Sequence, residues 1–333
     1  MKTVIYEPTE ENIKKCAEII RRGGLVAFPT ETVYGLGADA FNEDACRRVY
    51  EAKGRPSDNP LIVHIARASD IGQLTPRLSE DIVKLIDNFW PGPLTIVVKK
   101  KDTISRTVSG GLDTVAVRLP DSEATRALIN WAGTPIVGPS ANTSGKPSPT
   151  KAEHVLHDLD GRIDAIIDEG DCRVGIESTV LDMTGDVPTI LRPGIVTKEN
   201  IEAALGKTVE LDPTLTAGKP AGEDFQPKAP GMKYKHYAPK ADMLIVEGNR
   251  EAVKNEVERL RILNEKLGNK VGILLFEEKT FNEAAHEFFA DLRDMDEQGV
   301  DMILAGALSD AEGVGFAVMN RMLKSAGYNI VRV

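Results

Sequence analysis

The sequence predicts an α/β protein of two domains. The larger N-terminal domain has a mixed, twisted sheet with helices, and the smaller C-terminal domain is doubly wound and Rossmann-like. Three observations lead to this prediction. The chain has 333 residues, which is long for a single hydrophobic core. Strand-like runs alternate with amphipathic helical stretches on both sides of residues 206–240. That segment holds five prolines and four glycines without sustained periodicity, as a linker does.

The first domain, residues 1–205, contains short apolar runs that are typical of strands. They lie at 25–28 (LVAF), 61–65 (LIVHI), 94–98 (LTIVV), 114–119 (TVAVRL), 163–168 (IDAIID), 178–183 (STVLDM) and 189–193 (TILRP). The helices between them begin at polar caps, and we expect these at Asn42, Ser79 and Ser122. Gly54 should end the first of these helices. Thr150 and Glu153 predict a capping box for another helix.

The second domain, residues 241–333, follows a β-α order that predicts a parallel sheet with helices on both faces. Strands are expected at 243–248 (MLIVEG), 271–276 (VGILLF), 301–308 (DMILAGAL) and 329–333 (NIVRV). Helices are expected over about 250–266, 284–295 and 314–327.

The composition, 41% hydrophobic and 28% charged, is that of a soluble protein, and we expect a cytoplasmic one. No apolar run approaches eighteen residues, and the N-terminus lacks the apolar region of a signal peptide. Cys16, Cys46 and Cys172 form no CxxC pattern, so no protein metal site is expected. The net charge of −10 argues against broad nucleic-acid binding. An anionic ligand therefore needs a local cationic pocket, which we expect within residues 1–240.

Two glycine- and proline-rich motifs allow more than one interpretation. GLGADA (35–40) fits a relaxed dinucleotide fingerprint, but PTETVY separates it from the preceding strand, so we reject a Rossmann site there. KGRPSDNP (53–60) places Lys53 and Arg55 on a stiff, exposed bend. Lys53 could simply complement the helix dipole, which contributes about 0.3–1 kcal/mol, whereas Arg55 before a proline has no such explanation. A solvated turn and an anion site fit this segment equally.

Polar residues recur where predicted strands end. Arg118 in TVAVRLP lies at such an end, where α/β proteins form their sites, whereas the lone His64 is typical of a hydrogen-bonded core residue. In GPSANTSGKPSP (138–149), several short side chains that can donate hydrogen bonds follow a predicted strand. This composition is typical of phosphate-binding loops and also of many surface loops. ESTV (177–180) and ILRPG (190–194) also place a polar residue at the end of a predicted strand. KYKHYAPK (233–240) adds tyrosines and cations that a plain spacer does not need.

These segments contain no nucleophile–base–acid triad, no paired catalytic carboxylates and no P-loop. Such an inventory suits a reaction in which the substrates supply the nucleophile, while the protein positions them and neutralises phosphate charge. The residues alone therefore predict an α/β enzyme that acts on a nucleotide or another phosphorylated anion.

Taken in order, PTETVYGLG, KGRPSDNPLIVH, WPGPLT, VAVRLP, GPSANTSG, ESTV and LRPG closely resemble the YrdC-type domain of threonylcarbamoyl-AMP synthases. HYAP in a proline-rich linker before a small α/β domain is similar to the two-domain form of that family. The resemblance implies a YrdC-like first domain and a nucleotidyltransferase that makes threonylcarbamoyl-AMP and pyrophosphate from L-threonine, bicarbonate and ATP, with Mg²⁺ accompanying ATP. The product would pass to a tRNA threonylcarbamoyl-transferase complex, for threonylcarbamoyladenosine in tRNAs that read codons beginning with A.

The resemblance also implies the site residues. It assigns catalysis to Lys53 and Arg55. It assigns L-threonine to Thr32, His64, Arg118, Gly138 and Ser178. It assigns ATP to Lys53, Arg55, Asn59, Thr114, Ser140, Ser148, Arg192 and Tyr237.

Arg118 would pair with the threonine carboxylate. Tyr234 stays open as an alternative to Tyr237, and residues 228–240 are expected to fold over the cleft as a lid. Direct tRNA binding would be weak or absent. The competing hypothesis is a YrdC-like module that binds RNA without this catalysis.

Overall fold

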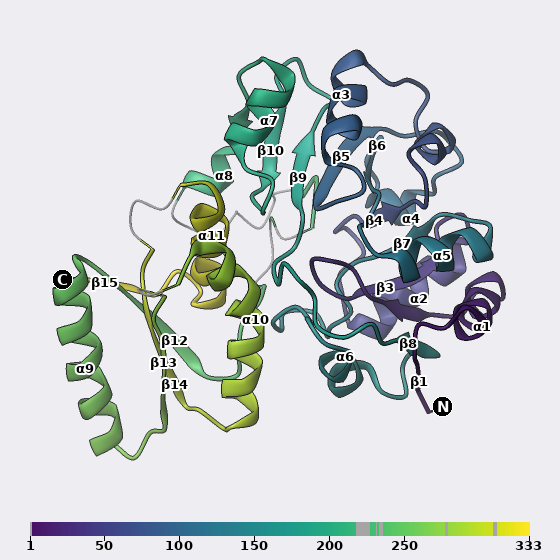
Figure 1. The fold of residues 1–333 in the computed structure, drawn as a ribbon. Coiled ribbons are helices and arrows are strands. Elements are labelled where there is room, and N and C mark those ends of the chain that lie inside the picture. Colours follow the sequence, from purple (N-terminus) through teal and green to yellow (C-terminus); the bar gives the residue numbers. More distant parts are fainter. Residues whose placement is uncertain (1, 218–226, 231, 233–235, 277–278, 309–311) are drawn as a thin grey trace.

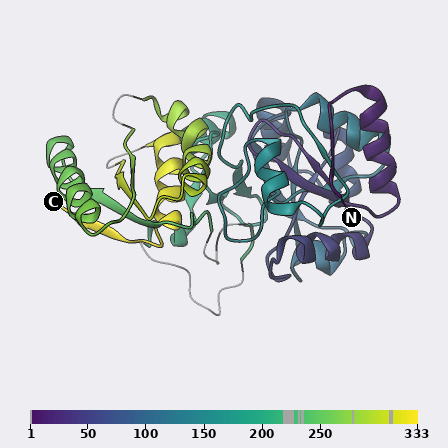
Figure 2. The same cartoon turned by 90° about the horizontal axis from the view of Figure 1, so that it is seen from below.

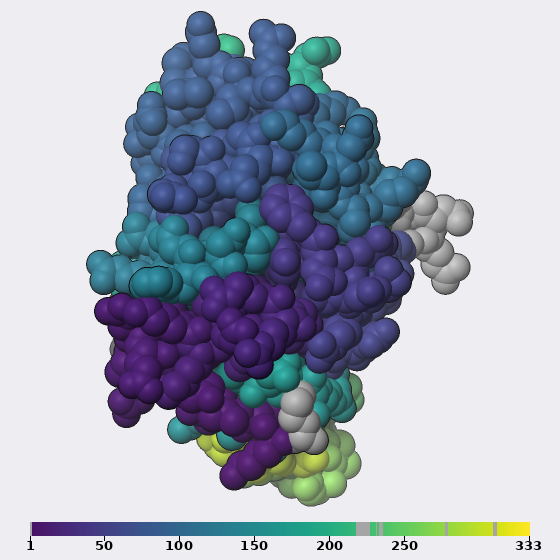
Figure 3. Space-filling view, turned by 90° about the vertical axis from the view of Figure 1, so that its right-hand side faces the viewer, coloured from purple at the N-terminus to yellow at the C-terminus, as the bar shows by residue number. Residues whose placement is uncertain are grey.

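The structure is a computed structural model that describes all residues except 1, 218–226, 231, 233–235, 277–278 and 309–311. The described chain forms two domains, each built on its own sheet, and Figures 1 and 2 show them next to each other. The predicted α/β class with a large mixed sheet and a separate smaller parallel sheet is confirmed. Figure 3 looks at the side of the first domain that lies away from the second, where mainly residues of the first half of the chain are visible.

The sheet of the first domain has eleven described strands, and parallel and antiparallel pairs are mixed in it. Their order is β1 (Val4–Tyr6), β8 (Ala165–Ile167), β2 (Val26–Phe28), β3 (Gly35–Asp39), β7 (Ile136–Val137), β4 (Ile62–His64), β6 (Thr114–Arg118), β5 (Leu94–Lys99), β9 (Thr179–Asp182), β10 (Thr189–Arg192) and β11 (Glu210–Leu211). Because β3 is an ordinary strand antiparallel to β2, GLGADA is not a nucleotide loop, and its rejection as a Rossmann site is confirmed.

The sheet continues into the segment predicted as a linker. Strand β11 pairs in parallel with β10, and Val209 beside it is 1% exposed. The short apolar pattern of VEL is difficult to find in the sequence because prolines and glycines surround it.

The helices of the first domain begin largely where their caps predict. The described helices are α1 (Glu10–Arg21), α2 (Glu43–Lys53), the 3₁₀ helix η1 (Ala68–Gln73), α3 (Glu80–Phe89), α4 (Arg106–Ser109), α5 (Glu123–Ala132), α6 (Ala152–Leu159), α7 (Lys198–Leu205) and α8 (Pro213–Thr216). The side chains of Asn42, Ser79 and Ser122 each accept a hydrogen bond from the backbone three residues later. Gly54 ends α2 in the left-handed conformation.

The capping box predicted for α6 is wrong. This helix begins after Lys151, which makes no side-chain cap bond. The backbone N–H of Thr150 instead donates to His154 Nδ1 at 3.2 Å, so Thr150 is held by the helix it was expected to cap.

The second domain is a parallel sheet with helices on both faces, as predicted. Its strand order is β13 (Val271–Leu274), β14 (Met302–Gly306), β12 (Asp242–Glu247) and β15 (Ile330–Arg332). Helix α9 (Arg250–Lys266) covers the outer face, and α10 (Phe281–Glu297) and α11 (Gly313–Ser325) lie between the sheet and the first domain (Figure 1). In the described part of the chain, every helix is too short or too polar to cross a bilayer.

Candidate active site

A small cavity brings most of the predicted site residues together. All five positions assigned to L-threonine line it, and so do four positions assigned to ATP. The lining residues are Thr32, Val33, Arg55, Ile62, His64, Arg118, Gly138, Pro139, Ser140, Glu177, Ser178, Arg192, Pro230, His236 and Tyr237. The volume of this cavity is about 40 Å³, which is room for a few water molecules only.

Arg118 lies at the carboxyl end of β6, beside His64 of the parallel neighbour β4. It is 4% exposed. Its Nη1 donates to Thr32 Oγ1 at 2.9 Å and its Nε to the carbonyl of Gly92 at 3.3 Å. Its Nη2 lies 2.7 Å from Glu31 Oε1, an ion pair whose atoms are not aligned as a hydrogen bond. The guanidinium is therefore held in place from the protein side.

Glu31 is a functional candidate that the sequence analysis missed. A carboxylate in a hydroxyl-rich loop carries no signal of a partner 87 positions later in the chain. Only the pairing of sheet and loop in three dimensions brings Glu31 to Arg118.

His64 is a neutral imidazole facing the cavity. Burial, followed by the Arg118 charge, holds its pKa well below the usual value of 6.5. Among the described residues, no group bonds to its Nδ1. Gly138 is needed beside it, because a Cβ there would lie 2.6 Å from both His64 Nδ1 and Phe28 Cζ. Nδ1 is therefore a buried polar atom whose capacity for a hydrogen bond is unused among the described residues.

Arg192 is a second buried cation of the cavity, 5% exposed, whose pKa is lowered chiefly by burial. Its Nε donates to the Ser178 carbonyl at 3.1 Å and its Nη2 to Ser178 Oγ at 3.2 Å. Ser178 Oγ in turn lies 2.8 Å from Thr95 Oγ1. These bonds fix Arg192 at the end of β10 next to the threonine positions.

Glu177 was also missed, although it belongs to ESTV. Ser148 Oγ donates to its Oε1 at 2.5 Å, and Arg321 of the second domain donates to its Oε2 at 2.9 Å. Ser148 therefore stands behind Glu177 and is not among the residues that line the cavity.

The expectation that Lys53 lies on an exposed bend is wrong, since Lys53 is 1% exposed. Its ammonium donates to the carbonyls of Ser140 and Asn142 at 2.5 and 2.6 Å, and burial lowers its pKa well below 10.5. Lys53 thus holds the GPSAN loop (138–142) through its backbone carbonyls. Arg55, which is partly buried, does line the cavity, and its Nη2 donates to the Pro60 carbonyl at 3.1 Å.

Two further ATP candidates lie outside the cavity lining. Asn59 is 1% exposed, and no described group bonds to either atom of its amide. Thr114 is at the opposite end of β6 from Arg118. Their assignments stay predictions.

The described end of the linker contributes to the lining of the cavity. Pro230, His236 and Tyr237 line it, and Ala238 N donates to the Gly145 carbonyl at 2.8 Å. Tyr237 is 5% exposed and adopts a φ of +65°, and its ring packs at a tilt against that of Phe289, with 5.1 Å between ring centres.

Ala229 and Met232 pack on apolar residues of the first sheet, which are Ile62, Val97, Ala116, Val180 and Leu191. Tyr234, the alternative to Tyr237, lies outside the described residues.

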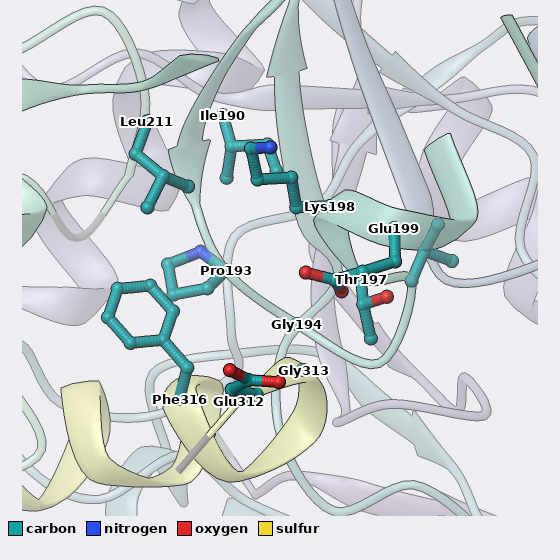
Figure 4. A pocket seen from close by; sticks show the side chains of 11 residues that line it. Ile190, Pro193, Gly194, Thr197, Lys198, Glu199, Leu211, Glu312, Gly313 and Phe316 are labelled. Atoms are coloured by element: carbon teal, nitrogen blue, oxygen red, sulfur yellow. The ribbon is translucent and has the colours of Figure 1, made fainter. Parts of the chain in front are cut away.

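A second cavity, of about 260 Å³, lies between β10, α7 and the first turn of α11 (Figure 4). Phe316 and Leu211 lie on one side of it, the Glu199 carboxylate lies on the other side, and the Glu312 carboxylate lies near Phe316. None of the residues assigned to threonine or ATP lines it. We therefore place the candidate active site in the first cavity.

Comparisons with known proteins match both domains. The family described as "Telomere recombination" matches residues 18–194, and the family "Threonylcarbamoyl-AMP synthase, C-terminal domain" matches residues 196–327. A threonylcarbamoyl-AMP synthase of Pyrococcus abyssi is 47% identical, over 99% of this chain and 98% of its own. One of Bacillus subtilis is 46% identical, over 97% and 95%. The crystal structure of P. abyssi Sua5 with L-threonine superposes with a TM-score of 0.94 at 45% identity, covering all of both chains.

Proposed function

Since the chain belongs to the family of threonylcarbamoyl-AMP synthases, which are enzymes, we propose that it makes L-threonylcarbamoyl-AMP. The substrates would be L-threonine, bicarbonate and ATP, and pyrophosphate would be released. One observation supports this proposal most directly. Five threonine positions and four ATP positions, scattered over more than two hundred residues, line one cavity. A relative that superposes over the whole of both chains has been crystallised with L-threonine.

In this proposal, Arg118 binds the threonine carboxylate through the part of its guanidinium that Thr32, Glu31 and the Gly92 carbonyl leave accessible. The neutral Nδ1 of His64 accepts a hydrogen bond from the amino acid. Threonine's amine takes up CO₂ from bicarbonate and becomes a carbamate. A carbamate oxygen then attacks the α-phosphorus of ATP, and pyrophosphate leaves.

Arg55 and Arg192 would bind the phosphates of ATP. Both arginines line the cavity, and neither is assigned to L-threonine. They would stabilise the negative charge that develops on the phosphates. Lys53 would act indirectly, by holding the loop that carries Ser140.

Mg²⁺ would enter with ATP and take most of its ligands from phosphate and water. Glu177 is the only carboxylate among the described residues that line the cavity, and both of its oxygens already accept bonds. In the described part of the chain, no cluster of three or more His, Cys, Asp or Glu side chains suits a metal ion.

The linker would act as a lid. About 40 Å³ is too small for threonine and ATP together, so in this proposal Pro230, His236 and Tyr237 move when the substrates enter. Closure would then keep water from the mixed carbamic–phosphoric anhydride. The product would pass to a tRNA threonylcarbamoyl-transferase complex for threonylcarbamoyladenosine formation, which would place the reaction in the cytoplasm.

The competing hypothesis of an RNA-binding module has less support. Arg118 and Arg192 are 4% and 5% exposed, so they are not available to an RNA backbone on the surface. A salt titration separates the two hypotheses, because RNA binding through phosphates weakens steeply as salt rises.

The direct test is to incubate the protein with ATP, L-threonine and ¹³C-bicarbonate and to identify the product by mass spectrometry. The proposal expects threonylcarbamoyl-AMP that carries the label, formed without RNA. Salt-sensitive RNA binding with no labelled adenylate would favour the competing hypothesis instead.

A further inference from the structure

Helix α10 of the second domain packs closely on the first domain, on the side that faces it in Figure 1. Near the start of the helix, the His286 carbonyl approaches Gly175, where a Cβ would lie only 2.3 Å from it. Nδ1 of the same histidine lies 3.1 Å from the Arg173 carbonyl. About two turns later, Arg293 reaches the first domain and is 6% exposed. These two points of contact fix α10 against the first domain.

Arg293 bonds to the loop that carries two of the predicted ATP residues. This loop, GPSANTSGKPSP (138–149), contains Ser140 and Ser148. Nη2 of Arg293 donates to the Pro147 carbonyl at 2.6 Å, directly before Ser148, and to Asp158 Oδ2 of α6 at 3.0 Å. The second domain therefore holds the backbone of the loop immediately beside an ATP position.

Asp158 connects Arg293 to the middle of the loop. Its carboxylate is fully buried. Oδ1 accepts a bond from Lys146 Nζ at 3.0 Å, and Oδ2 accepts one from the Thr143 N–H at 3.2 Å in addition to that from Arg293. Burial raises the pKa of this carboxyl, but the bonds and charges of Arg293 and then Lys146 bring the pKa below its usual value. Arg293 thus helps to keep the buried carboxylate charged, and the carboxylate holds the loop.

The threonine side of the same loop is held by the sheet of the first domain. Gly138, which is assigned to L-threonine, donates its N–H to the Ile62 carbonyl at 2.8 Å. The carbonyl of the next residue accepts a bond from the Leu36 N–H at 2.7 Å. Loss of Arg293 should therefore release residues 143–148 and leave Gly138 in place.

We propose that Arg293 is a positioning residue for ATP. It holds residues 143–148 of the first domain from the second domain, so nucleotide affinity depends on the contact between the domains. Fixing a loop before the ligand arrives lowers the entropic cost of binding. Arg293 is not among the described residues that line the candidate cavity, so it acts through the loop. The inference rests on the proposed function, because Ser140 and Ser148 bind ATP only in that proposal.

Calorimetric titration of the full chain tests the inference, with L-threonine and α,β-methylene-ATP with Mg²⁺ as separate ligands. Arg293→Met removes the donors and keeps an apolar stem. Arg293→Lys is the conservative variant, because both bonds come from one nitrogen atom and a lysine ammonium can replace them. Arg259→Met is the control for the loss of a cation, since Arg259 is exposed and its ion pair with Glu256 lies at the surface of α9. Thermal melting of each variant measures stability in parallel.

Arg293→Met should weaken binding of the ATP analogue at least fivefold and binding of L-threonine less than twofold. Arg293→Lys should restore most of the affinity for the analogue, and Arg259→Met should bind both ligands as the unmodified protein does. A merely structural Arg293 would lower the melting temperature of Arg293→Met and leave the ratio of the two affinities unchanged. That result would overturn the inference.

If Arg293→Met does not fold, Arg293→Met with Asp158→Asn decides, because this pair of changes leaves no buried carboxylate without its cation. Unweakened binding of the ATP analogue in the double variant would overturn the positioning role and leave the proposed synthase activity untouched. An unmodified protein that binds neither the analogue nor L-threonine would contradict the proposed function itself, and the inference with it.

Discussion

Arg321, on the last helix of the C-terminal domain, donates a hydrogen bond of 2.9 Å to Glu177 in the wall of the candidate active-site cavity. Both side chains are buried, at 0% and 6% exposure. The Arg321 guanidinium also lies 5.7 Å from the centre of the Tyr237 ring. The second domain therefore contributes to the site of the first, through a charge pair that no solvent screens.

Arg321→Ala should reduce both turnover and stability, because it leaves the Glu177 carboxylate buried without its cation. Breaking a buried pair in this way costs about 3–5 kcal/mol. Arg259→Ala is the matched control, since Arg259 is exposed and its ion pair with Glu256 lies at the surface, where such pairs contribute little. Urea unfolding together with the rate of pyrophosphate release measures both effects. Equal behaviour of the two variants would show that the Arg321 pair does not hold the cavity wall.

Arg55→Ala should lower ATP-dependent turnover at least tenfold with little effect on stability, because it removes a charge-assisted hydrogen bond of about 1.5–3 kcal/mol to phosphate. Lys53→Ala should lower turnover too, but also destabilise the fold, since the Ser140 and Asn142 carbonyls lose their buried donor. Steady-state kinetics and thermal melting separate the two. Near-normal turnover in both variants would return the KGRPSDNP segment to a structural turn.

Arg118→Lys should raise the KM for threonine more than the KM for ATP. Lysine keeps the charge but cannot present the planar fork that a carboxylate accepts, and it loses the bond to Thr32. The two KM values are measured on the same preparation. An equal rise in both would mean that Arg118 does not bind the threonine carboxylate.

Tyr237→Ala should reduce retention of the adenylate, since the Tyr237 ring lines the cavity and packs against Phe289. A chain that ends at Ala217 should show a larger defect; it keeps β11 and the buried Val209, but it also loses Arg321, the partner of Glu177. Ending at Gly206 would remove both, so it is the poorer test. The ratio of intact adenylate to its hydrolysis products is the measurement. If both proteins retain the adenylate as the full chain does, the linker is only a tether.

Lys324 should make stability depend on pH. Burial, then Arg321 and Arg192, lower its pKa to about 7, against 10.5 for an ordinary lysine. Between these values the unfolded chain holds the proton more tightly, so stability rises with pH; below pH 7 the folded protein carries the full cost. Lys324→Met should therefore be the more stable protein at pH 6, by about 1 kcal/mol or more, with a smaller advantage at pH 9. Urea unfolding at both pH values checks this, and a constant difference would contradict it.

Much of the fold could be predicted because local signals agree with it. Asn42 and Gly54 delimit α2, and apolar runs such as LIVHI become strands. The failures have local causes. At α6, the ring of His154 takes the backbone bond expected for a cap, and β11 is too short to show a period.

The site is harder to predict because its residues act through partners far away in the chain. The motifs identify Arg118 and Arg192. Glu31 and Arg321 can be recognised only from the three-dimensional structure, where Glu31 pairs with Arg118 and Arg321 pairs with Glu177. Burial of Lys53 likewise depends on carbonyls of Ser140 and Asn142, almost ninety residues later. A sequence motif shows that a cation is present, but not which oxygen atoms surround it.

Pyrophosphate release with L-threonine, bicarbonate or ATP omitted in turn tests the proposed synthase activity most directly. The cavity predicts release that requires all three substrates and no RNA, because threonine carbamate must form before it can attack the α-phosphate. Release that continues at the same rate without threonine or without bicarbonate would contradict the proposed reaction.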